Sequence, residues 1–149
     1  MSGKIKLTSE ELGLMSLFQN TTGATARDCI LDQKIERVIF VVTKGEMGLA
    51  IGKAGANIKN VQQLIGKEIE LVEWSDDPKQ FIMNALNPQM VSEVRVSDKP
   101  DGSKTATVVV DQRRKGAILG KAGRNAEKAR LLAKRYFNVE TIHIVTPQQ

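Results

Sequence analysis

The sequence contains one cysteine, Cys29, and one histidine, His143. A lone cysteine cannot form a disulfide within the chain or build a cysteine-based zinc cluster, which fits a protein of a reducing compartment. The histidine falls in a predicted strand and has no predicted serine, cysteine or carboxylate partner, so we expect a packing or surface role for it. We therefore expect no active site, no metal site and no cofactor.

Long apolar segments are missing as well. The longest run, residues 38–42, is far shorter than a transmembrane helix requires. Near the N-terminus, Glu10 and Glu11 stand where a secretory signal needs an apolar core. We expect a cytoplasmic protein with no membrane partner, and nothing in the sequence indicates a small-molecule substrate.

What the sequence does contain is a repeated motif. Gly-Lys-Ala-Gly occurs at residues 52–55 and again at residues 120–123, and another glycine, Gly48 or Gly116, precedes each copy by four residues. The copies are 68 residues apart (120 − 52 = 68) in a chain of 149 residues. A repeat at nearly half the chain length indicates two modules rather than one domain.

Hydrophobic periodicity and capping residues predict the elements of each module. Thr8 and Glu11 form the pattern of a capping box, and residues 75–77 offer caps for a helix that has Pro78 at its first position. We expect helices at 9–19, 47–51, 56–65, 78–86, 113–119 and 124–136, and strands at 27–31, 37–43, 68–74, 92–97, 105–111 and 139–145.

The shift of 68 residues also relates the elements around the motif. A predicted helix at 10–18 maps onto 78–86, and a predicted strand at 37–42 maps onto 105–110. The chain is therefore expected to be an α+β protein made of two α-β-β-α-α-β units. The expected domains are residues 1–75, of which the first few are disordered, and residues 76–149, which are more basic.

Positive charge is concentrated in the second half. Residues 1–75 contain nine basic and nine acidic side chains, whereas residues 76–149 contain thirteen and eight. Nine of the basic residues fall within residues 112–135, where Glu127 is the only acidic one. A solvated helix face is the usual explanation for a run of charge, but one placed beside the repeated motif suggests a polyanionic partner.

The motif itself is suited to phosphate groups. Two glycines separated by two residues permit a sharp turn and leave no side chain to block a phosphate–sugar chain. The amides at the start of the following helix and the helix dipole favour an anion, and Lys53 and Lys121 add positive charge. A single copy would be explained as an ordinary corner between helices. Two copies with identical inner residues favour a binding role.

The motif does not match the P-loop of nucleotide-binding proteins, which has four residues between its glycines and a serine or threonine after its lysine. Here three residues separate Gly48 from Gly52, an alanine follows Lys53, and the second copy differs in the same way. The dinucleotide fingerprint Gly-x-Gly-x-x-Gly is also absent. Hydrolysis of ATP or GTP is therefore not expected.

Residues 51–58, Ile-Gly-Lys-Ala-Gly-Ala-Asn-Ile, resemble the signature of the KH domain, an RNA-binding module whose Gly-x-x-Gly loop clamps about four nucleotides. The extra N-terminal helix and strand resemble the type II form. Residues 69–88, which join the modules, resemble the junction between the KH modules of the NusA family, whose short archaeal members consist of two such modules. The resemblance implies two tandem type II KH domains, each with a three-stranded sheet packed against helices.

The resemblance also implies a function. It is that of a non-catalytic factor of transcription elongation or termination that binds single-stranded RNA, with RNA polymerase or other transcription machinery as a further candidate partner. Bases would lie in apolar grooves beside Leu49 in the first module and beside Ile118 in the second. The expected RNA-binding residues are Gly52, Lys53, Ala54, Gly55, Gly120, Lys121, Ala122, Gly123, Arg124, Arg113, Arg114, Lys115, Lys128, Ile51, Ile58 and Leu119.

Other functions are compatible with the sequence. A KH protein of ribosome assembly or RNA processing would use the same loops, and a nucleotide-binding regulator would use them as phosphate sites. A purely structural scaffold would not need the basic residues that gather in residues 112–135. Because the first loop lies in a neutral half and the second in a basic one, we expect the first to depend more on groove contacts and the second more on charge.

Overall fold

The computed structural model describes residues 6–120 and 123–147. The chain divides into two compact units, one that ends at Trp74 and one that begins at Ser75, which we call the first and second modules. No helix in these described ranges is long and apolar enough to cross a membrane. The disorder expected for the first few residues concerns residues 1–5, which lie outside the described part of the chain.

The first module begins with a long helix, whose capping box is formed as predicted. The Thr8 side chain accepts a hydrogen bond from the Glu11 amide at 3.1 Å, and Glu11 Oε1 accepts one from the Thr8 amide at 2.8 Å. The elements of this module are α1 (Ser9–Thr22), β1 (Ala26–Asp32), β2 (Arg37–Val42), α2 (Met47–Ile51), the 3-10 turn η1 (Lys53–Gly55), α3 (Ala56–Ile65) and β3 (Glu68–Glu73).

The second module repeats this order. Its first helix is capped by Asp77, whose Oδ1 accepts a hydrogen bond from the Lys79 amide at 3.0 Å. The elements are α4 (Pro78–Leu86), the 3-10 turn η2 (Pro88–Met90), β4 (Val91–Asp98), β5 (Lys104–Val110), the 3-10 turn η3 (Gln112–Arg114), α5 (Lys115–Leu119), α6 (Arg124–Phe137) and β6 (Val139–Val145). The α-β-β-α-α-β order and the α+β fold expected from the sequence are therefore confirmed.

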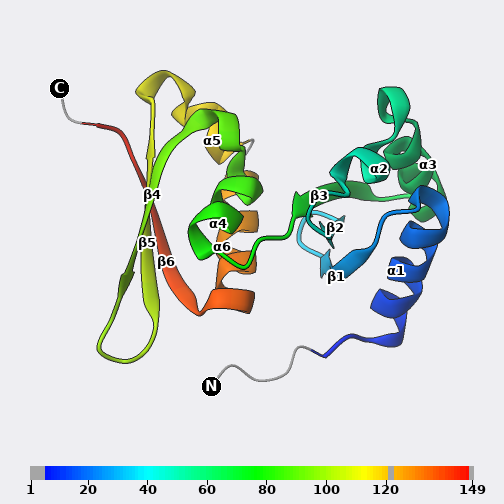
Figure 1. Cartoon of the computed structure of the whole chain (residues 1–149), viewed down its shortest axis with the longest axis horizontal. Coiled ribbons are helices and arrows are strands. Elements are labelled where there is room, and N and C mark those ends of the chain that lie inside the picture. Colours follow the sequence, from blue (N-terminus) through cyan, green and yellow to red (C-terminus); the bar gives the residue numbers. More distant parts are fainter. Residues whose placement is uncertain (1–5, 121–122, 148–149) are drawn as a thin grey trace. The chain divides into compact units, whose positions relative to one another are not determined.

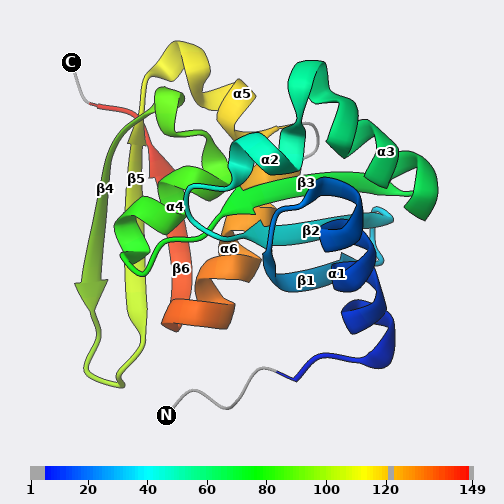
Figure 2. The same ribbon diagram turned by 45° about the vertical axis from the view of Figure 1, so that its right-hand side comes forward.

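Each module has a three-stranded sheet with helices on one face (Figures 1 and 2). The strand orders are β1-β2-β3 and β4-β5-β6. In both sheets the middle strand is antiparallel to the first strand and parallel to the last. Parallel neighbours require a crossover connection, and here the crossover is a pair of helices. The Gly-Lys-Ala-Gly segment is the turn within that crossover.

Aromatic rings anchor both cores. In the first module Phe18 from α1 stacks on Phe40 from β2, with ring centroids 4.4 Å apart, and both side chains are fully buried. Cys29 is buried in the same cluster. In the second module Phe81 from α4 meets Tyr136 and Phe137 of α6 at 5.4 and 5.6 Å. These contacts pack α1 against β2 in the first module and α4 against α6 in the second, so each crossover is joined to a packed core.

The middle strands of the two sheets differ. Every residue of β2 is buried, whereas β5 alternates between buried and half-buried positions. The burial of β2 includes Arg37, whose side chain is inaccessible to solvent. Its Nε lies 2.8 Å from Asp32 Oδ2 and its Nη1 lies 2.9 Å from Glu70 Oε2. The sequence predicts the strand correctly but not this buried ion cluster, because the two carboxylates come from neighbouring strands.

We expect the replacement Arg37→Leu to lower the free energy of unfolding of the first module by about 3 kcal/mol. The leucine would leave two mostly buried carboxylates without their cation, and breaking a buried ion pair from one side costs about that much. Arg95→Leu is the control, because Arg95 pairs with Glu93 at 2.8 Å while both side chains are half exposed or more. An exposed pair contributes about 1 kcal/mol or less. Urea unfolding followed by circular dichroism measures both changes, and equal losses would contradict the prediction.

Candidate nucleic-acid interface

The first Gly-Lys-Ala-Gly segment, residues 52–55, turns the chain from α2 into α3. Gly52 has φ 76° and ψ 172°, a conformation almost confined to glycine, and Gly55 has φ 76° and ψ 16°, which is left-handed. Between them, Ala54 is also left-handed at φ 54°. The turn is closed by the Gly55 amide, which donates to the Gly52 carbonyl at 3.1 Å. The backbone conformation alone therefore accounts for both glycines.

Gly52 is also constrained by its neighbour Asn57. A Cβ atom at Gly52 would lie 2.7 Å from Asn57 Cγ and 2.9 Å from the Asn57 backbone nitrogen. Asn57 is held in this place because its Nδ2 donates to the Leu49 carbonyl at 2.8 Å. This bond satisfies a carbonyl at the end of α2 and fixes the start of α3 against it. Asn57 thus positions the turn.

The second turn repeats the geometry in the residues that the structure describes. Gly120 has φ 76° and ψ 174°, and Gly123 has φ 73° and ψ 17°. A Cβ atom at Gly120 would lie 2.9 Å from Asn125 Cγ, and Asn125 Nδ2 lies 3.5 Å from the Ala117 carbonyl. The second asparagine is therefore held less tightly than the first. Two of the residues expected to bind RNA, Lys121 and Ala122, lie outside the described part of the chain.

The positioning role of these two asparagines is not among the predictions made from the sequence. The signal was present, because Asn57 and Asn125 are also separated by 68 residues (125 − 57 = 68). A residue that repeats in register beside a repeated glycine pair is a candidate for shaping the same turn.

The apolar side chains expected in the first groove are accessible. Leu49 is 53 % exposed and Ile51 is 40 % exposed, and Ile58 is half-buried at the start of α3. Lys53 and Ala54, at the tip of the turn, are both exposed. The first module therefore presents apolar and cationic groups around the same turn.

The second groove differs from what we expected. Leu119 is half-buried, but Ile118 is fully buried, so the expectation that Ile118 lines a groove is wrong. Ile118 corresponds to Ala50 (50 + 68 = 118), which is fully buried in the first core. The short helices α2 and α5 place this position against the core in both modules. The Ile118 side chain is larger than that of Ala50 and fills more of its core.

The basic residues near the second turn have unequal access to solvent. The Arg113 side chain is 91 % exposed and has its Nε 3.8 Å from Asp111 Oδ1. Arg114 is exposed and donates from Nη1 to the Gln89 carbonyl at 3.3 Å, while Lys115 and Arg124 are half-buried. Lys128 is only 9 % exposed, which argues against the direct contact with RNA expected of it.

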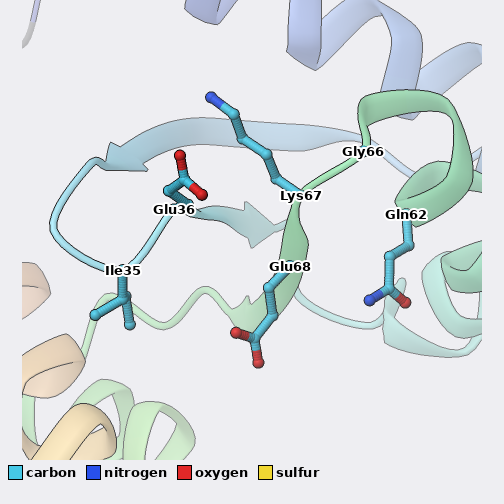
Figure 3. A pocket seen from close by; sticks show the side chains of 6 residues that line it. All are labelled: Ile35, Glu36, Gln62, Gly66, Lys67 and Glu68. Carbon is cyan, nitrogen blue, oxygen red and sulfur yellow. The ribbon is translucent and has the colours of Figure 1, made fainter.

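A hollow of about 520 Å³ lies at the far end of α3 from the turn (Figure 3). Figure 3 shows Lys67 on the side of Glu36, whereas Glu68 and Gln62 project the other way. Because α3 has ten residues, about 15 Å separates this hollow from the turn. Two carboxylates beside one lysine do not suit a polyanion, so this end of the module is separate from the interface. The described residues contain no group of three or more histidine, cysteine or acidic side chains suited to a metal ion.

Comparison with known families defines the class of protein. The KH domain matches residues 14–76, and the NusA-like second KH domain matches residues 78–147. The chain is therefore a tandem KH-domain protein.

Individual relatives extend over most of the chain. It is 39 % identical over 142 residues to the "Probable transcription termination protein NusA" of Methanococcus vannielii, an alignment that covers 95 % of this chain and 80 % of that protein. It is 36 % identical over 141 residues to the protein of the same name from Halococcus morrhuae, covering 95 % and 99 %. The crystal structure of APE1850 superimposes with a TM-score of 0.83 at 38 % identity, covering 93 % of this chain and all of that one. The chain belongs to the family of short NusA-like proteins, as its sequence resemblance implied.

We expect Gly52→Ala to destabilise the first module more than Gly55→Ala does. Both positions have φ 76°, so both substitutions strain the backbone. A Cβ atom at Gly55 would meet its nearest neighbours at 3.8 and 3.9 Å, which is ordinary contact, whereas one at Gly52 would overlap Asn57. Strain alone costs about 1–3 kcal/mol, and the overlap adds to it only at Gly52. Thermal unfolding of the two variants measures the difference, and equal losses would contradict the role given to Asn57.

Proposed function

We propose that this chain is a non-catalytic, cytoplasmic factor of transcription that binds single-stranded RNA through its two Gly-x-x-Gly loops. The observation that carries the proposal is the repetition of one glycine turn, with matching backbone angles, at the same place in both modules. The relatives named for transcription termination support a role in termination or elongation.

The helices that follow the loops support an external anion. The helices α1 and α4 begin with side-chain caps from Thr8 and Asp77. By contrast, α3 and α6 begin at Gly55 and Gly123, which provide no side-chain cap. The first amides of a helix need an acceptor, and the dipole favours a negative one. A backbone phosphate of RNA can fill the place that a side chain fills in α1 and α4.

The surroundings of each loop suggest how the rest of the nucleotide is held. In the first module the exposed Leu49 and Ile51 and the half-buried Ile58 offer apolar contact to bases. In the second module Arg113 and Arg114 add exposed positive charge near the turn. Two loops in one chain raise the effective concentration of the second site once the first is occupied, which strengthens binding to a longer strand.

Replacement of the two inner residues of each loop by aspartate tests the proposal. Ala54 has a left-handed backbone, which aspartate adopts more readily than alanine, so Lys53→Asp with Ala54→Asp keeps the turn. We expect each altered loop to weaken binding of single-stranded RNA by roughly 10- to 150-fold, the loss of one charge-assisted hydrogen bond. With both loops altered, binding should be lost. Fluorescence anisotropy with a labelled oligonucleotide measures the affinity.

A matched control changes the charge equally at the far end of the first module. Gln33→Asp with Lys34→Asp alters two exposed residues of the turn between β1 and β2. This control should keep most of its RNA affinity. A folded chain with both loops altered and undiminished affinity would contradict the proposal. Co-purification with RNA polymerase rather than with ribosomes would support the role in transcription over one in ribosome assembly or RNA processing.

The dependence of RNA affinity on salt should separate the two loops. If the intact chain neutralises about four phosphates, the logarithm of its affinity should fall with that of the salt concentration with a slope near −3, since each phosphate on a single strand contributes about −0.7. We expect alteration of the second loop to flatten this slope more than alteration of the first, because Arg113 and Arg114 add exposed positive charge near the second turn. Equal slopes for the two variants would contradict the unequal use of charge.

A further inference from the structure

Both sheets have a β-bulge at the same place. The register shifts between Ala26 and Asp28 in the first module and between Val91 and Glu93 in the second. Ala26 pairs with Val42 and Val91 pairs with Val110, and these partners are equivalent in the repeat (42 + 68 = 110). The extra residue of the bulge is therefore Arg27 in the first module and Ser92 in the second.

The pairing of the last strand in each sheet identifies a second pair of equivalent positions. Val41 pairs with Val72 and Val109 pairs with Val145, and Val41 and Val109 are equivalent in the repeat (41 + 68 = 109). Two positions further along the chain stand Trp74 and Pro147. Arg27 and Trp74 of the first module therefore occupy the same places relative to their sheet as Ser92 and Pro147 of the second.

In the first module the side chains of Arg27 and Trp74 stack on each other at this end of the sheet. The Arg27 guanidinium lies 4.3 Å from the centroid of the Trp74 ring, and the Trp74 amide donates to the Val42 carbonyl at 2.8 Å. In the second module the smaller Ser92 and Pro147 border a hollow of about 790 Å³, which we call the bulge cavity. It is lined by Ser92, Asp111, Gln112, Arg113 and Pro147. The second module therefore has an open space where the first has a stacked cation and aromatic ring.

The lining of the bulge cavity suits a flat group with polar edges. The guanidinium of Arg113 is planar, almost fully exposed and able to stack on an aromatic face. The amide of Gln112 and the hydroxyl of Ser92 can both donate and accept hydrogen bonds, and the ring of Pro147 supplies an apolar surface. Asp111 Oδ1 already accepts from the Arg113 amide at 3.0 Å, which keeps this side of the cavity in place. A nucleobase has this combination of aromatic face and polar edge.

We propose that the bulge cavity is a subsite for one base of the RNA strand held at the second loop. The proposal rests on the proposed function, because it takes its ligand from the strand bound at residues 120–123. Arg113 and Gly120 are seven residues apart along η3 and α5, which corresponds to about 10 Å. A strand bound at the loop can therefore reach the cavity. The first module has no such subsite, since Arg27 and Trp74 occupy its place.

Filling the bulge cavity tests the subsite. Ser92→Arg with Pro147→Trp rebuilds in the second module the pair found in the first. The full chain with the first loop altered to aspartates is crosslinked to oligouridines that carry one 4-thiouridine at successive positions. In the unfilled chain we expect adducts on Gln112, Arg113 or Pro147 from one position of the strand. Filling the cavity should remove these adducts and keep those near the loop.

Affinity provides a second readout. An abasic nucleotide at the crosslinking position should weaken binding about 5-fold in the unfilled chain, the lower end of what one stacked base contributes in single-strand binding proteins. The filled variant should be insensitive to that change. Ser97→Arg is the matched control, since it adds the same charge at an exposed position of β4 and should behave like the unfilled chain.

The results of these experiments separate a failure of the subsite from a failure of the proposed function. Adducts confined to the loop region, or adducts and abasic sensitivity that persist in the filled variant, would overturn the subsite while leaving the proposed function intact. Absence of any RNA binding by the unaltered chain would overturn both. If the filled variant does not fold, Gln112→Ala changes one exposed side chain of the cavity and should reduce the abasic sensitivity at the same position; unchanged sensitivity would overturn the subsite.

Discussion

The contact between a loop glycine and an asparagine of the next helix shapes both modules. At Gly52 the space for a side chain is taken by Asn57, and at Gly120 it is taken by Asn125. Because each asparagine also reaches a carbonyl of the preceding short helix, the contact joins the two crossover helices across the turn. The turn lies between the two helices of the crossover that joins the middle strand to the last strand. The direction of the turn is thus set by this packing, and the side chains around it that we propose to bind RNA are carried on the same frame.

Much of the fold could be predicted from the sequence because its determinants are local. The capping box at Thr8, the cap at Asp77 and the alternation of apolar residues act within a few residues of themselves, and the repeat fixed the number of modules. The features that the sequence did not predict correctly depend on how the elements pack against one another. Whether Ile118 faces a groove or the core depends on how a short helix is rolled against the sheet. The ion cluster of Arg37 includes Glu70, 33 residues away, and Asn57 acts on a carbonyl eight residues away.

The two modules share a turn and differ in what surrounds it. The strand β2 is buried along its whole length, whereas β5 alternates. The helix α6 has 14 residues where α3 has ten, so it carries additional basic residues beyond the repeat. At the bulge, one module closes its sheet edge with its own side chains and the other leaves that edge open. The glycine turn, which we propose to meet the phosphate backbone, is thus preserved between the modules, while the elements that would meet the bases have diverged.

The stack of Arg27 on Trp74 has a practical consequence. Trp74 is the only tryptophan of the chain and belongs to the first module, and Tyr136 is the only tyrosine and packs against Phe81 in the second. Each module therefore carries its own intrinsic chromophore, in surroundings that are lost on unfolding. Tryptophan emission reports on the stack of Trp74 with Arg27, and the tyrosine signal reports on the packing of α6 against α4. The intact chain therefore offers a separate label-free probe in each half.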